Sequence, residues 1–108
     1  MSSTVLATIE LGQLETGTGK PVVNIAWIAG DNPCRDQDKY TPISAAGQNP
    51  CGVHFTLENG FTYYETNCGS SAIDLYYADG AFNSHCQQKS WLCTNQNQYN
   101  IRQTWTCY

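Results

Sequence analysis

The chain has 108 residues, enough to bury one modest hydrophobic core, so we expect a single domain over residues 1–108. Five basic side chains stand against nine acidic ones, for a net charge of −4, and the basic residues do not cluster. This balance disfavours nonspecific binding to nucleic acid, which depends on neutralising phosphates, so we expect none, and no apolar run is long enough for a membrane-spanning helix.

The first half of the chain predicts two strands followed by a long loop. Residues 4–11 and 21–28 are rich in β-branched and apolar residues, and a Gly- and Thr-rich turn separates them. In the second strand, Val23, Ile25 and Trp27 share one face, which we expect to be the core face. Residues 29–50 hold three prolines and no sustained period, so we expect a loop there.

Two successive hairpins are predicted between residues 51 and 85, because each half runs from Cys-Gly through a strand and a Gly-containing turn to a second strand. In the first, Asn59-Gly60 is the favoured pair for a two-residue turn. Counting outward from such a turn, Cys51 faces Cys68, so the two could form a disulfide. Asp79-Gly80 turns the second hairpin.

The same register assigns the two faces of the first hairpin. It places Val53, Phe55, Leu57 and Tyr64 in the core and His54, Thr56, Glu58, Tyr63 and Glu65 on the outer face. A last strand over 99–107 alternates apolar and polar residues in the same way. About seven strands without a helical period predict an all-β fold, an antiparallel sandwich or small barrel with one long loop at 29–50.

Cysteine usage indicates the compartment. An even number of cysteines, six in all, with no CxxC pair or zinc-type cluster predicts disulfides and no metal site, and no cofactor motif is present. Disulfides persist in oxidising surroundings, so we expect a secreted protein, read here as a mature chain because its start lacks signal-peptide features. The six are Cys34, Cys51, Cys68, Cys86, Cys93 and Cys107.

One cluster of side chains could support catalysis. If the last strand lay beside the first hairpin, His54, Glu58, Glu65 and Arg102 would converge on one open sheet face, a set suited to acid–base cleavage of RNA. This set is similar, in residue type alone, to that of the small secreted fungal guanyl-specific ribonucleases, with His85 as the second histidine. The simpler interpretation, a solvated polar face, is favoured, so we expect no catalytic residue.

Exposed tyrosines favour recognition instead. Tyr63, Tyr76 and Tyr108 fall on outward positions, where a ring offers a large contact area at little entropic cost. Small cysteine-rich secreted chains with sparse charge resemble fungal effectors, toxins and allergens as a broad class. We therefore expect an extracellular recognition protein that binds a glycan or a host protein without catalysis. A ribonuclease-like hydrolase and an antimicrobial or protease-inhibitory protein are the alternatives.

Overall fold

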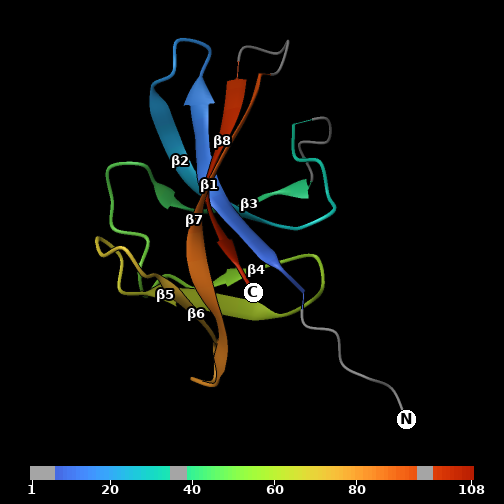
Figure 1. The fold of residues 1–108 in the computed structure, drawn as a ribbon, viewed down its shortest axis with the longest axis vertical. Coiled ribbons are helices and arrows are strands. Elements are labelled where there is room, and N and C mark those ends of the chain that lie inside the picture. Colours follow the sequence, from blue (N-terminus) through green and yellow to red (C-terminus); the bar gives the residue numbers. More distant parts are fainter. Residues whose placement is uncertain (1–6, 35–38, 95–98) are drawn as a thin grey trace.

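The computed structural model describes residues 7–34, 39–94 and 99–108, and eight β-strands make up its framework (Figure 1). Within these ranges no helix is long and apolar enough to cross a membrane. The strands are β1 (Ile9–Thr16), β2 (Pro21–Ile28), β3 (Thr41–Ala45), β4 (Phe55–Thr56), β5 (Thr62–Thr66), β6 (Asp74–Tyr77), β7 (Phe82–Thr94) and β8 (Tyr99–Cys107).

All eight strands form one antiparallel sheet in the order β3-β2-β1-β8-β7-β6-β5-β4. The sheet is nearly closed into a barrel, because its two edge strands meet where the hydroxyl of Thr41 donates to the carbonyl of Thr56 at 3.2 Å. The long strand β7 joins the two halves, pairing first with β6 and then with β8. The all-β antiparallel prediction is confirmed.

The predicted loop at 29–50 contains a strand that periodicity did not reveal. Strand β3 pairs with β2 at the sheet edge, with Asn24 opposite Ser44. Its proline, Pro42, is tolerated there because an edge strand leaves one row of backbone donors unpaired. The prediction of an uninterrupted loop is therefore wrong, and the number of strands is eight where about seven were predicted.

The turn of the first hairpin has three residues, not the predicted two. The amide of Leu57 donates to the carbonyl of Phe61 at 3.1 Å, so residues 58–60 form the loop. Gly60 alone takes a positive φ, 86°, as in a type I turn followed by a bulge. The Asp79-Gly80 hairpin repeats this geometry, with the amide of Tyr77 donating to the carbonyl of Ala81 at 2.8 Å.

The extra loop residue moves every side chain of β5 to the opposite face, because side chains alternate along a strand. Phe55 pairs with Tyr63 in the observed register. Tyr63 and Glu65 are therefore inside, where both are buried, and Tyr64 is outside. The predicted outward positions of Tyr63 and Glu65, and the inward position of Tyr64, are wrong.

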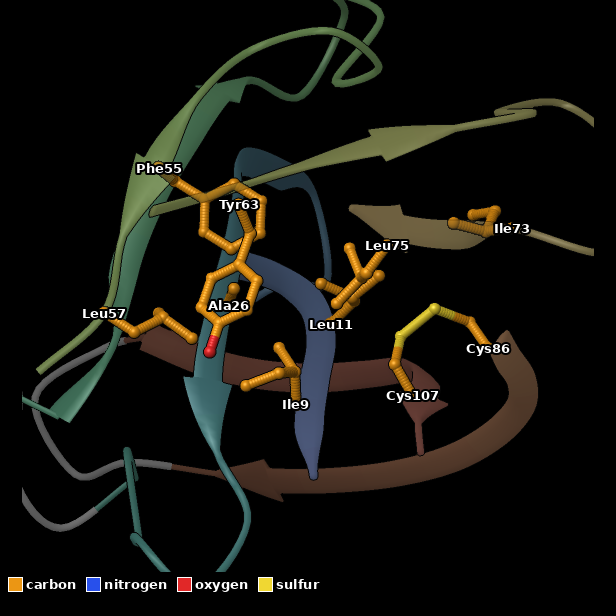
Figure 2. Close-up of a cluster of buried hydrophobic side chains, with 10 residues drawn as sticks. All are labelled: Ile9, Leu11, Ala26, Phe55, Leu57, Tyr63, Ile73, Leu75, Cys86 and Cys107. Carbon is orange, nitrogen blue, oxygen red and sulfur yellow. A yellow bond between two sulfur atoms is a disulfide. The ribbon is translucent and has the colours of Figure 1, made fainter. Parts of the chain in front are cut away.

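The main core fills the space inside the curved sheet (Figure 2). Side chains from both halves of the sheet meet there: Ile9, Leu11, Ala26, Phe55, Leu57, Tyr63, Ile73, Leu75, Cys86 and Cys107. The opposite face of β2 carries a second, smaller cluster of Ile25, Trp27 and Ile101. The face of β2 that was predicted to enter the core, with Ile25 and Trp27, is therefore buried, but it packs on the outside of the barrel.

Three disulfides join the strands, and the pairing of Cys51 with Cys68 is the predicted one. It forms although the register differs, because β4 has only two residues and Cys51 leaves the hairpin to meet Glu65 in an isolated bridge. Cys86 faces Cys107 across β7 and β8 and their disulfide enters the core. The third disulfide joins Cys34 to Cys93.

Candidate binding sites

The side chains of the predicted acid–base cluster do not converge. Strands β6 and β7 separate β8 from the first hairpin, so Arg102 lies away from it. Its Nε donates instead to Oε2 of the buried Glu15 at 2.7 Å. Glu58 is exposed and pairs with Lys39 at 3.4 Å. Glu65 lies on the inner face and contacts neither Arg102 nor Glu58.

The outer face of β5, β6 and β7 carries a row of contacting rings, which we call the aromatic ladder: His54, Tyr64, Tyr76, Phe82 and His85. Successive ring centroids lie 5.3, 5.7, 5.5 and 4.8 Å apart. His54 and Phe82 are exposed, and the tyrosines are half-buried. The contacts of His54 with Tyr64 and of Tyr64 with Tyr76 are stacked, whereas Phe82 meets Tyr76 at 84° and His85 at 56°.

The three tyrosines predicted to bind a ligand have different surroundings. Tyr76 is on the outer face, within the aromatic ladder, as its alternation predicted. Tyr108 is the last residue and is 64% exposed. Tyr63 is only 2% exposed and packs between Phe55 and Tyr77. A buried ring offers no contact to a partner, so Tyr63 is not part of a binding surface.

A concave site that sequence reasoning missed lies over the outer face of β1, β2, β7 and β8. It is a hollow of about 210 Å³ between Trp27 and Trp91, and we call it the two-tryptophan cleft. The ring centroids are 6.3 Å apart and the ring planes are tilted by 50°. Trp27 is 3% exposed and forms its floor, whereas Trp91 is 38% exposed and forms a side. Glu10, Gly30, Asp31, Lys89 and Gln103 complete the lining.

The cleft holds the carboxylate acceptors of Glu10 and Asp31 beside the donors of Lys89 and Gln103. Glu10 is buried and its Oε1 accepts from the hydroxyl of Thr106. Asp31 has a buried oxygen, Oδ2, that receives no hydrogen bond from the residues described. An unpaired buried acceptor costs free energy unless a ligand or water donates to it. The cleft is therefore suited to a ligand rich in hydroxyl groups.

Register explains how the cleft assembles. Glu10 faces Trp27 across β1 and β2, and Trp91 faces Gln103 across β7 and β8. Four strands thus supply neighbouring side chains on one face. The one signal of this site in the sequence was the alternation that placed Trp27 on a face with Val23 and Ile25. Trp91 could not be added to it, because the strand that became β7 was not predicted beyond Cys86.

Glu65 forms a third polar feature, inside the barrel. It is 4% exposed, and burial raises the pKa of its carboxyl group to about 7. Its Oε1 lies 3.6 Å from the sulfur of Cys68, but a disulfide sulfur has no proton to donate. Across the described ranges of the chain, no N–H or O–H group donates to this carboxyl group.

This burial predicts a pH-dependent stability. Between about pH 4.5 and 7 the folded chain keeps the Glu65 proton that the unfolded chain has lost, so raising the pH favours unfolding. The free energy of unfolding falls by on the order of 3 kcal/mol at most over this pH range. Urea unfolding from pH 4 to 8 should show it, and Glu65→Gln should remove it. Glu58→Gln, at an exposed site, is the control; an equal loss in Glu65→Gln would assign the effect to another group.

Known proteins give no guide to these sites, because no protein-family model, curated protein or solved structure matches the chain. Among the described residues, no group of three or more His, Cys, Asp or Glu side chains could hold a metal ion.

Proposed function

We propose that this chain is an extracellular recognition protein that binds a glycan, without catalysis, in the two-tryptophan cleft. The observation that carries the proposal is the position of Trp27 and Trp91 beside the acceptors of Glu10 and Asp31 in one hollow. Three disulfides in a small chain are typical of extracellular proteins, which supports the compartment.

The chemistry of a sugar matches the cleft on two counts. Its C–H groups pack well on indole rings, and its hydroxyl groups can donate to carboxylate and amide oxygens. Gln103 and Lys89 add donors for the ring and glycosidic oxygens. A few polar groups converging on an apolar floor is the usual composition of a small-ligand site.

The aromatic ladder supports a second candidate function, the recognition of a protein surface. Its tyrosines, histidines and exposed Phe82 form an aromatic patch, and aromatic residues are enriched at protein interfaces. His85 is held there by Asp74, whose Oδ1 lies 2.7 Å from its Nδ1. The ladder and the cleft share β7 but have no residue in common, so separate substitutions distinguish them.

We expect Trp91→Ala to lower the affinity for an oligosaccharide at least tenfold, because a central ring of a binding site contributes about 1.4 kcal/mol or more. The measurement is a glycan array followed by calorimetry on the strongest hit. Trp91 is partly exposed, so the fold should tolerate the change. Tyr76→Ala, in the aromatic ladder, is the matched control and should bind as the wild type does.

The opposite pattern, loss with Tyr76→Ala and none with Trp91→Ala, would move the site to the ladder. An array without hits would overturn the glycan proposal. Release of reducing ends from the bound oligosaccharide would overturn its noncatalytic part, and cleavage of single-stranded RNA that is lost in His54→Ala would favour the ribonuclease alternative.

A further inference from the structure

A hollow on the inner side of the sheet has no role in the proposed function. Its volume is about 350 Å³, within the range of small-ligand pockets, and it opens between the inner face of β1, β2 and β8 and the segment from Glu65 to Ser70. Leu11, Ile73 and Trp105 give it apolar walls. It lies on the opposite face of β1 from the two-tryptophan cleft, because Glu10 and Leu11 alternate along the strand.

The polar atoms that line this cavity accept hydrogen bonds but have few donors to give. The carboxyl group of Glu65 receives none from the described residues. Gln13 donates its Nε2 to Oδ1 of Asn24 at 3.0 Å, while its own Oε1 accepts no hydrogen bond from the described residues. The hydroxyl of Thr104 donates to the carbonyl of Leu11 at 3.4 Å.

Among the residues that the structure describes, no basic side chain forms an ion pair with Glu65. It is the one lining residue that ionises near neutral pH, since Cys68 is in a disulfide. On the strands nearby, Glu15 of β1 is paired with Arg102 of β8, and Asp74 of β6 with His85. Strands β2 and β3 carry no charged residue, and Glu65 is the one charged residue of β5. A buried carboxyl group without a partner is costly when ionised.

We propose that this cavity binds a small organic ammonium ion with an apolar body, such as a primary aralkyl amine. The ammonium group would donate to the Glu65 carboxylate and to Oε1 of Gln13, and the apolar body would lie against Leu11, Ile73 and Trp105. The unpaired acceptors of this lining select a donor, and a buried, unpaired carboxylate selects a cation over an alcohol. The proposal does not depend on the glycan site.

The test is calorimetry with 2-phenylethylamine and its uncharged counterpart, 2-phenylethanol. At pH 8 we expect the amine to bind at least tenfold more tightly than the alcohol. Below about pH 7 its affinity should fall about tenfold per pH unit, because Glu65 must first lose its proton while the amine stays charged up to about pH 10. At pH 6, binding should release close to one proton, measured in two buffers of different ionisation heat.

Glu65→Gln should abolish the preference for the amine, whereas Glu58→Gln, which removes an exposed carboxylate, should leave it unchanged. Equal affinity for amine and alcohol, an unchanged preference in Glu65→Gln, or the absence of saturable binding would each overturn the proposal. Proton release is measured on the wild type, so its absence would overturn the role of Glu65 even if the variant failed to fold.

Discussion

Replacing Tyr63 with alanine should lower the free energy of unfolding by about 3–5 kcal/mol, because the change leaves a large cavity in the core. The ring is 2% exposed, with centroid distances of 5.9 Å to Phe55 and 5.4 Å to Tyr77. Its hydroxyl also accepts a hydrogen bond from Nδ2 of Asn59 at 3.0 Å. Urea unfolding monitored by circular dichroism measures the loss.

Two variants separate the contributions. Tyr63→Phe keeps the ring and removes only the hydroxyl, so it should cost about 1 kcal/mol. Tyr76→Ala removes a tyrosine from the outer face of the next strand, where only ring contacts are lost, and should also cost about 1 kcal/mol. If Tyr63→Ala proved no more costly than Tyr76→Ala, the two-residue turn would be right and the observed register wrong.

Removing the disulfide between Cys86 and Cys107, by replacing both residues with alanine, should lower the free energy of unfolding by about 4–5 kcal/mol. The bond spans 21 residues, and releasing a loop of that length costs about 3 kcal/mol. Both residues are also buried in the main core, so the lost sulfur atoms add roughly 1–2 kcal/mol. Such a loss approaches the whole stability of many small domains.

The disulfide between Cys51 and Cys68 is the matched comparison. It spans 17 residues, so its loop term is also about 3 kcal/mol, but both cysteines are only half-buried and lie outside the core. The double alanine variant at this pair should therefore be the more stable of the two in urea. An equal or larger loss there would mean that the core packing of Cys86 and Cys107 contributes nothing.

Local signals in the sequence predicted much of the framework. β-Branched runs and Gly-containing turns located most strands, and the even cysteine count predicted disulfides. The register depended on a smaller detail, whether Glu58 belongs to the strand or to the turn. Because side chains alternate, that single residue decided which face of β5 entered the core, the face of Tyr63 and Glu65 or that of Tyr64.

The candidate sites could not be predicted because they depend on strand order. Glu10, Trp27, Trp91 and Gln103 lie on four strands that only the sheet places side by side. Trp27 belongs to an apolar alternation that is typical of a core face, and nothing local distinguishes a second, outer cluster from a core. The inner cavity that Glu65 lines likewise depends on the register of β5 and on the closure of the barrel.

Indole N–H signals give the most direct test of glycan binding in the two-tryptophan cleft. The chain has three tryptophans, of which Trp27 and Trp91 line the cleft and Trp105 lines the separate inner cavity. In a nitrogen–proton spectrum titrated with the strongest oligosaccharide from the array, the signals of Trp27 and Trp91 should shift with one saturation curve while that of Trp105 stays unchanged. Movement of Trp105 alone, or of none of the three, would contradict the assignment of the cleft as the glycan site.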